Sequence, residues 1–547
     1  MSASALFSIG TKAMTASYAA LATTGHNISN ANVQGYSRQQ VELATAAGQY
    51  SGAGYFGKGV DVTTVTRAHD AFLTREAATS RSLAAMDATR LQLLQQLEAA
   101  FPTGEQGVGH AAGEFLNSMV DLSARPTDAA TRQVVLARAG EVATRFAAAG
   151  AQFDTLQMQV RDELQGGVAK INQLAESIAT LNQRIAASLG TGQAPNDLLD
   201  QRDQALSDLS QHLQLSTVRA DDGSVTVFGA GGQRLVMGAQ AQRLSVQPDP
   251  SDATRAVIGL SDGGSLRLLQ TQELGGGSVA GLLRFQDEDL VDARTLMGQL
   301  AAALAGKVNE QQALGLDMGS PPGSGVPIFA AGAPVAVPNA NNATNGQVSL
   351  SIIDASQLRA SEYALSADPG GAPGVWQLTR LQDGFVSSIH SGQVVDGMRI
   401  DIGSPPAPAP AAGDRFLLQP VTRAANGMQR VLDDVNGIAA ASSSSANGNA
   451  LAFTALREAA MVGGSTITDA YASAMADIGV RVQGAGSSAQ ISSAVAAQAE
   501  STRSANSGVN LDEEAARLIQ YQQSYQAAAK ILQIAQTIFD TLLDAAR

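Results

Sequence analysis

The sequence contains no cysteine, which excludes disulfide bonds, thiolate metal sites and cysteine nucleophiles from the 547-residue chain. Aromatic residues are also scarce. They make up 4% of the chain and include a single tryptophan, Trp376. No run of 18 uninterrupted apolar residues occurs, so we expect no membrane span. These shortages are more typical of a protein with long, alanine-rich helices than of a compact enzyme.

Basic residues are in the minority. The 35 lysines and arginines face 49 acidic residues, and the formal net charge is −14. This balance argues against nucleic acid and anionic membrane as main partners. The N-terminus lacks the basic region and cleavage site of a signal peptide, since only Lys12 is charged between Met1 and Gly25. We therefore expect a chain that stays in the cytosol or leaves by a route that reads no cleavable signal.

The sequence shows no motif for nucleophilic or metal-dependent catalysis. None of the histidines belongs to an i, i+4 metal pair, and we expect surface or capping roles for them: His26, His69, His110, His212 and His390. The glycines of Gly229–Gly232 lack the spacing of a phosphate-binding loop. The acidic run Asp287–Asp292 lies in a helical pattern and lacks the glycine of a calcium loop.

One cluster of carboxylates surrounds an arginine in the sequence. Residues 196–203 read NDLLDQRD, with three acidic side chains around Arg202. A glycosidase carboxylate pair is one interpretation. A helix start is favoured, with Asn196 as the N-cap and Asp200, Arg202 and Asp203 in surface pairs. We therefore predict that the chain is not an enzyme, with no catalytic, cofactor-binding or metal-binding residue and no cofactor.

Apolar residues recur every seven positions in the last 38 residues, from Asn510 to Arg547. They form a seam of the coiled-coil type: Leu511, Leu518, Tyr521, Tyr525, Leu532, Phe539 and Leu542, with Ala528 and Ala535 completing the pattern. Asn510 is the expected N-cap, and the acidic residues after it suit the start of a helix. The seam is rich in alanine and needs a partner.

A second heptad pattern lies at the other end of the chain, at Phe7, Met14, Leu21 and Ile28. We expect the two terminal helices to pair with each other, or with copies from neighbouring subunits. These eleven residues of the two patterns, without the alanines, form the predicted assembly seam. The alternative of ordinary core helices in a bundle stays open. Two heptad-patterned ends around an unlike middle favour an assembly protein.

Between its ends the chain alternates helical and β-like segments. We predict a multidomain α+β protein, with a long α-helical coiled-coil or bundle rod formed by N- and C-terminal segments and with inserted β-rich domains. The expected division is listed here: terminal helices at 1–45 and 505–547, a helical rod at 46–200, 276–315 and 431–504, and β-rich outer domains at 201–275 and 316–430. A short strand or hairpin is expected within Gly54–Arg67.

Several stretches together resemble the flagellar axial protein family, and the resemblance runs from end to end. HNISNANVQGYSRQQVEL at 26–43 is similar to the asparagine-rich motif of rod, hook and hook-associated proteins. NLDEEAARLIQYQQSYQAAAKILQIAQTIFDTLL at 510–543 is similar to the matching C-terminal segment. PNDLLDQRDQAL at 195–206 and the segment 276–301 resemble internal parts of the hook-associated members. Val33 and Gln34 depart from the Thr-Pro that is more frequent before Gly35.

The resemblance implies a structural component of the bacterial flagellum that joins the hook to the filament. Its implied partners are other copies of the chain, the hook protein, a second junction protein, an export chaperone at the C-terminal helix and the flagellar type III export apparatus. It implies a location in the flagellum, outside the cell, reached without a cleaved signal peptide. The alternatives are another flagellar axial protein, such as the second junction protein or the hook protein, or a secreted scaffold whose outer β domain binds or hydrolyses a ligand.

Overall fold

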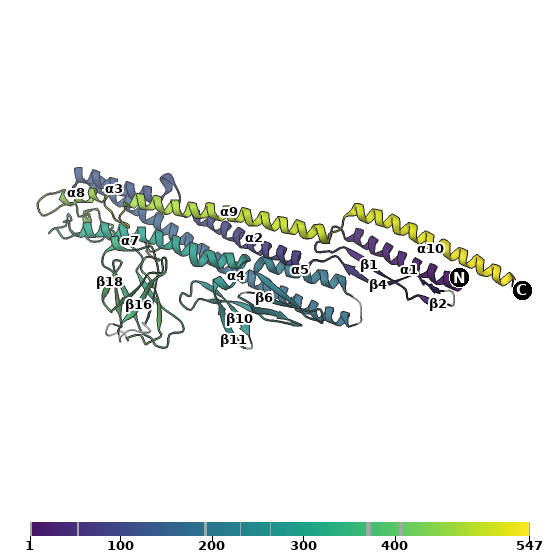
Figure 1. Ribbon diagram of the computed structural model, residues 1–547. Helices are drawn as coiled ribbons and strands as arrows, with labels where there is room; N and C mark the ends of the chain where they lie inside the picture. Colours follow the sequence, from purple (N-terminus) through teal and green to yellow (C-terminus); the bar gives the residue numbers. More distant parts are fainter. Residues whose placement is uncertain are drawn as a thin grey trace.

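The computed structural model describes residues 3–51, 54–190, 194–229, 231–262, 264–367, 374–403 and 408–545. Figure 1 shows an elongated molecule in which helices run along the length and β-sheets project to one side. The order of elements alternates helical and β segments. The predicted fold class, a helical rod with inserted β-rich parts, is confirmed.

Helices of very different lengths form the rod. They are α2 (Ala71–Glu98), α3 (Val108–Ala124), α4 (Ala129–Leu189), α5 (Asn196–His212), α6 (Ser278–Arg284), α7 (Val291–Ala313), α8 (Gly448–Ala455) and α9 (Ile467–Ser507), with a π-helical turn at Phe285–Leu290 between α6 and α7. Helix α4 has 61 residues and is roughly 92 Å long at 1.5 Å per residue. Asp128 caps it by accepting a 2.8 Å hydrogen bond from the backbone N–H of Thr131.

The hydrophobic core lies inside this rod and continues into the β-sheets. It extends from Leu93 on α2 to Ile478 on α9, and the apolar face of α4 contributes its fully buried Phe146 and Phe153. Among the described residues, none from α1 or α10 belongs to this core. The rod therefore has a core that does not depend on the two ends of the chain.

Antiparallel β-sheets project from the rod in two groups. The first contains β5 (Leu215–Arg219), β6 (Val225–Gly229), β7 (Gln233–Met237) and β8 (Gln240–Ala241) in one sheet, and β9 (Leu244–Pro248), β10 (Ala256–Asp262) and β11 (Ser265–Leu269) in another. The second contains β12 (Phe329–Ala330) paired with β21 (Gln429–Arg430), a sheet β13–β20–β15–β16–β17 and a sheet β14–β19–β18. Their bounds are β13 (Val335–Pro338), β14 (Val348–Ile352), β15 (Tyr363–Ala367), β16 (Trp376–Arg380), β17 (Val386–Ile389), β18 (Gln393–Val395), β19 (Met398–Ile402) and β20 (Arg415–Gln419).

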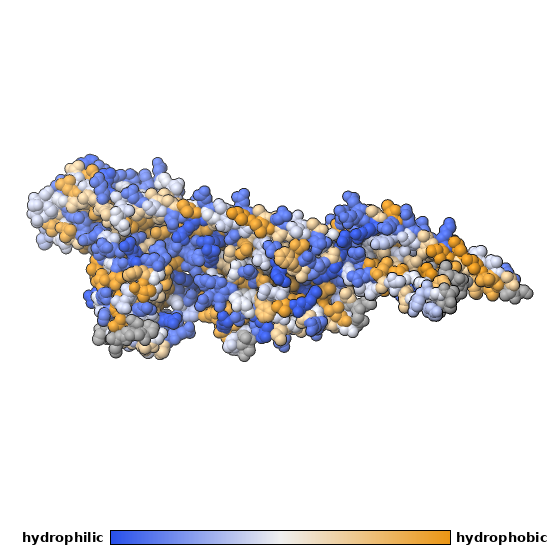
Figure 2. All heavy atoms as spheres, viewed as in Figure 1, coloured by the Kyte–Doolittle hydropathy of each residue, from blue (hydrophilic) through white to orange (hydrophobic). Residues whose placement is uncertain are grey.

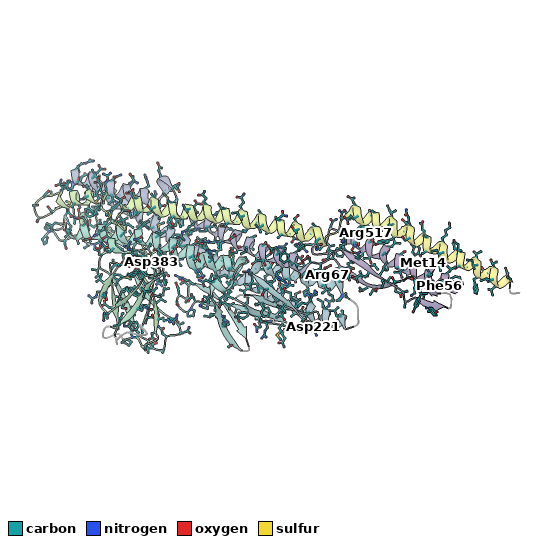
Figure 3. All side chains as sticks on the ribbon, in the orientation of Figure 1. Met14, Phe56, Arg67, Asp221, Asp383 and Arg517 are labelled. Carbon is teal, nitrogen blue, oxygen red and sulfur yellow. The ribbon has the colours of Figure 1, made fainter. Side chains whose placement is uncertain are left out.

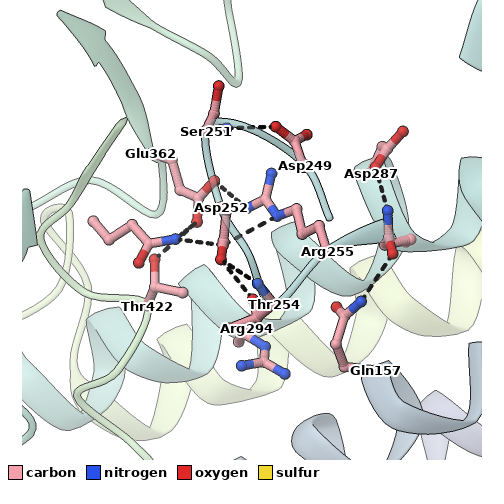
Figure 4. Close-up of polar contacts among 12 residues, drawn as sticks. Gln157, Asp249, Ser251, Asp252, Thr254, Arg255, Asp287, Arg294, Glu362 and Thr422 are labelled. Atoms are coloured by element: carbon pink, nitrogen blue, oxygen red, sulfur yellow. Dashed lines mark hydrogen bonds and ion pairs between the residues drawn. The ribbon is translucent and has the colours of Figure 1, made fainter. Parts of the chain in front are cut away.

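A buried polar network joins the two β groups (Figure 4). The carboxylate of Glu362 accepts hydrogen bonds from Arg255, from Gln419 at 3.0 Å and from Thr422 at 3.2 Å. Asp252 accepts a further bond from Gln419 at 3.1 Å. Because buried charges are costly unless paired, this network holds the β9–β10 loop against the larger sheet.

The two ends of the chain form a separate body that we call the terminal unit. It comprises α1 (Ala3–Asn30), α10 (Leu511–Ala545) and a β-ribbon of β1 (Gln39–Thr45), β2 (Gln49–Ser51), β3 (Gly54–Phe56) and β4 (Val60–Arg67). Strands β1 and β4 pair with each other, as do β2 and β3. In Figure 1, α1 lies between α10 and the ribbon, and both helix–helix and helix–ribbon contacts are present.

The element boundaries differ from the sequence-based division in two places. Helix α5 continues to His212 instead of giving way to β structure at residue 201, because its Leu209 is fully buried in the rod core. Strands form within Gly54–Arg67 as predicted, but they do not make a hairpin with each other, because β3 pairs with β2 and β4 pairs with β1. Residues 46–67 therefore belong to the terminal unit and not to the helical rod.

Candidate assembly surface

The two predicted seams face each other within one chain. The rings of Phe7 and Phe539 meet edge to face with centroids 6.4 Å apart. Gly10 brings the helices into close contact, because a Cβ at this position would lie 2.8 Å from Cδ2 of Leu532. The chain is thus its own partner for at least part of the seam. Contacts of the same residues with neighbouring copies stay a prediction.

The seam between α1 and α10 is shallow. Most predicted residues are half-buried, namely Phe7, Met14, Leu21, Ile28, Leu518, Tyr521, Tyr525 and Leu532, whereas Leu511, Phe539 and Leu542 are exposed. The deepest positions of α10 are Ala528, Ala535 and Glu514. Those of α1 are Gly10, Ala16, Ala20, Thr24 and Asn27. Small residues at the centre give close contact but bury little apolar area, so most of the larger side chains stay partly open to solvent.

A second apolar surface runs beside the seam and was not predicted. Ile531, Ile534, Ile538 and Leu542 follow a spacing of three and four residues, which places them on one side of α10. Between 37% and 57% of each side chain is exposed. Figure 2 shows apolar residues gathered along this thin end of the molecule. We call these four residues the outer stripe. Its spacing was visible in the sequence: Ile531, Ile534 and Ile538 lie outside the heptad positions, and Leu542 belongs to both patterns.

Asn27 connects the three layers of the terminal unit. Its amide nitrogen donates to the carboxylate of Glu514 on α10 and to the carbonyl of Gln39 on β1, each at 2.9 Å. Its amide oxygen accepts from the backbone N–H of Gln39 at 2.9 Å and from the hydroxyl of Tyr36 at 2.7 Å. Burial raises the pKa of Tyr36 above its usual range, and nearby carboxylates add to this, so the hydroxyl remains a donor. Asn27 lies in the asparagine-rich motif, but the pattern alone did not indicate this role.

A cluster of charges, which we call the basal joint, fixes the ribbon to α5 of the rod. Arg67 binds Asp200 at 2.7 Å and Asp203 at 2.6 Å, and His69 lies 3.3 Å from Asp203. The backbone N–H of Ser37 donates to Asp200 at 3.0 Å. Burial lowers the pKa of His69; Asp203 opposes this effect, and Arg67 adds to it.

Residues 196–203 begin a helix as predicted, α5, but the prediction of surface pairs is wrong. Asp200 is buried and Arg202 is fully buried, where its guanidinium donates to Asn182 and to the carbonyl of Gly223. Asn196 is the first residue of α5 and not its N-cap, and its side chain donates to the carbonyl of Val65. By contrast, the predicted N-cap Asn510 is confirmed, since it accepts from the backbone N–H of Asp512 at 3.0 Å.

Within the described ranges, no three His, Asp or Glu side chains are placed so that they could hold a metal ion. None of the helices in these ranges is long and apolar enough to cross a lipid bilayer. The feature that stands out is therefore the terminal unit, a body outside the core with uncovered apolar side chains. Such a body suits a subunit that completes its packing against other molecules.

Comparison with known families identifies the class first. Residues 501–545 match the family described as "Flagellar basal body rod FlgEFG protein C-terminal". This match indicates the class of flagellar axial proteins. Residues 94–329 match the "Flagellar hook-associated protein FlgK helical domain", and residues 337–420 match the "Flagellar hook-associated protein 1, D2-like domain".

Full-length relatives identify the family. The chain is 32% identical to flagellar hook-associated protein 1 of Salmonella typhimurium, covering 99% of this chain and 100% of the relative. It is 31% identical to the Escherichia coli K12 protein of the same name, with the same coverage. The crystal structure of the flagellar hook junction protein FlgK from Burkholderia pseudomallei has the same fold, with a TM-score of 0.71 at 24% identity over 78% of this chain and 99% of that one. The chain belongs to the flagellar hook-associated protein 1 (FlgK) family and is a structural component of the flagellum.

Proposed function

We propose that copies of this chain assemble into the junction between the hook and the flagellar filament. In this proposal the hook protein is the partner on one side and a second junction protein is the partner on the other. The single observation that carries the proposal is the terminal unit, whose helices pair through a shallow seam and leave the outer stripe partly exposed, with Ile531 at its edge next to Gly10 of α1. One apolar stripe on an isolated helix is a weak contact, but a ring of copies repeats it many times.

The parts of the chain have separate roles in this proposal. The terminal segments 1–45 and 505–547 form the inner tube. The eleven residues of the assembly seam, which belong to these segments, make the contacts within the tube, and the ribbon lies beside them. The rod carries the β-rich parts outward, where the network of Glu362 keeps them in one orientation. No catalytic chemistry is needed for such a role.

The route out of the cell is also part of the proposal. An exported subunit has to avoid association before it reaches the assembly site, and the outer stripe is exposed on the single chain. A chaperone bound to α10 would cover the stripe until the type III export apparatus accepts the chain. Export then proceeds without a cleaved signal peptide.

The test uses a bacterium that lacks this gene. Hooks without filaments, together with unassembled flagellin in the medium, are the expected result, and the wild-type gene on a plasmid should restore filaments. Normal filaments on the deletion strain would show that the junction role is wrong. Bare cells without hooks would instead point to an earlier axial protein.

A further inference from the structure

The tip of the ribbon carries an unusual group of side chains. In a chain with 4% aromatic residues, Tyr50, Tyr55 and Phe56 lie within seven positions. Between 43% and 79% of each side chain is exposed. The rings of Tyr50 and Tyr55 lie 5.6 Å apart on paired positions of β2 and β3. Aromatic side chains at such exposed sites are characteristic of protein interfaces.

This tip has no core of its own. Strands β2 and β3 form a two-stranded sheet, and such a hairpin is marginally stable in water unless another element covers it. Figure 3 places Phe56 at the end of the ribbon away from the rod, whereas Arg67 lies at the rod. The aromatic group therefore needs a covering surface that the rod of the same chain does not supply.

The outer stripe has properties that complement the tip. It presents four branched aliphatic side chains over about three turns of α10. Asp540 and Asp544 lie on other sides of the helix, and Lys530 lies at the edge of the stripe, one turn before Ile534. The stripe is continuous with the seam between α1 and α10, so a partner seated on it extends an interface that already exists. The seven side chains of the two surfaces carry no charge, so aromatic rings pack on aliphatic groups here, with Lys58 and Lys530 at the edge of the contact.

The two surfaces cannot meet within one chain in this arrangement. Helix α1 lies between α10 and the ribbon, in contact with both (Figure 1). The stripe lies on α10, one outer layer of the terminal unit, and the aromatic tip lies on the ribbon, the other outer layer. Two different surfaces on opposite layers fit a head-to-tail contact between copies. Contacts of this kind build rings or helical tubes, whereas a two-fold contact closes at a dimer.

We infer that the aromatic tip of the ribbon docks on the outer stripe of α10 in a second copy of this chain. The partner is thus another molecule of the same protein and not the hook protein. The inference rests on the proposed function, because it names the surfaces through which copies associate in the flagellum.

The absence of cysteine makes a disulfide test direct. Two single variants, Tyr55→Cys and Ile534→Cys, carry different tags and are produced together in the deletion strain. In purified flagella under mild oxidation, we expect a dimer that contains both tags. Neither variant produced alone should form a dimer. The matched control replaces Ile534→Cys with Gln526→Cys, an exposed polar position on another side of α10, and should give no dimer.

Three results would overturn the inference. They are the absence of a mixed dimer when both variants are present in the flagella, equal dimer formation with Gln526→Cys, and formation of a dimer by Tyr55→Cys produced alone. If the cysteine variants do not enter flagella, cross-linking of the wild-type chain tests the contact. This chain has five lysines, and a lysine-reactive reagent should join Lys58 to Lys530 in a dimer, with absence of this product counting against the contact. Absence of the unmodified chain from flagella would instead refute the proposed function.

Discussion

The substitution Ile534→Asp tests whether the outer stripe acts between copies. Ile534 is 55% exposed in the single chain and lies outside the rod core. Full burial of an isoleucine side chain contributes about 1.5–3 kcal/mol, so burial of the remaining surface on assembly contributes roughly 1 kcal/mol. An aspartate loses this contribution and adds the cost of burying an unpaired carboxylate, roughly 3 kcal/mol. The sum of about 4 kcal/mol corresponds to roughly 1000-fold weaker association at each contact.

The assay compares swimming, filament number and secreted flagellin in the deletion strain that carries each variant. We expect Ile534→Asp to leave hooks without filaments, while the variant protein itself appears in the medium and its rod unfolds at the wild-type temperature. Gln526→Asp, on another side of the same helix, is the matched control and should support normal filaments. Normal swimming with Ile534→Asp, or an equal defect with Gln526→Asp, would refute the reasoning.

Three further predictions concern the chain itself. Asn27→Ala removes four hydrogen bonds and should destabilise the terminal unit by roughly 3 kcal/mol, which faster amide hydrogen exchange at residues 24–40 and 511–517 would show. Asn30→Ala is the control and should change the exchange little, because Asn30 binds only its own helix. Gly150→Ala places a Cβ 2.5 Å from Cα of Asn426 and should lower the unfolding free energy by roughly 1–3 kcal/mol. On the same helix, the Cβ of Gly166→Ala has no atom within 4 Å, so this variant should raise the unfolding free energy by about 0.5–1 kcal/mol. Urea unfolding measures both changes. Burial lowers the pKa of His69 below its unfolded value of about 6.5, so the unfolded state binds more protons and the stability of the protein should fall as the pH drops below that value. Thermal unfolding at two pH values should show a smaller fall in stability for His69→Gln than for the wild type. An equal fall would contradict the assignment.

The terminal helices were predictable because a heptad pattern is a local property. The spacing from Leu511 to Phe539 is typical of one helical face whatever lies opposite. The partner was not predictable, because a leucine buried within a chain and one buried between chains have the same spacing. Gly10 resolves part of this question, since its missing side chain allows Leu532 of the same chain to approach.

The outer stripe was missed for a different reason. The heptad positions were followed along α10, and Ile531, Ile534 and Ile538 lie outside them. A count of exposed apolar residues over every side of the helix would have found a second stripe. The stripe and the seam share Leu542, so α10 has one wide apolar face, of which α1 covers only a part.

The basal joint shows what a local pattern cannot give. Asp200 and Arg202 are charged residues in a polar stretch, and such residues are usually exposed. Their burial depends on groups far away in the sequence, with Arg67 lying 133 residues before Asp200. The β-ribbon brings Arg67 to Asp200, and Arg202 binds Asn182 of α4 and Gly223 between β5 and β6. The spacing within residues 196–203 indicates none of these contacts.

The way the terminal unit is attached has a mechanical consequence. The backbone crosses between the unit and the rod twice, after Arg67 and after Ser507, and Arg67 is tied sideways to α5 through Asp200 and Asp203. One crossing alone would act as a swivel. Two backbone crossings and one set of lateral ion pairs connect the bodies at three points. The terminal unit therefore cannot rotate relative to the rod without straining the ion pairs or the backbone. The molecule is therefore built to pass torque along its length.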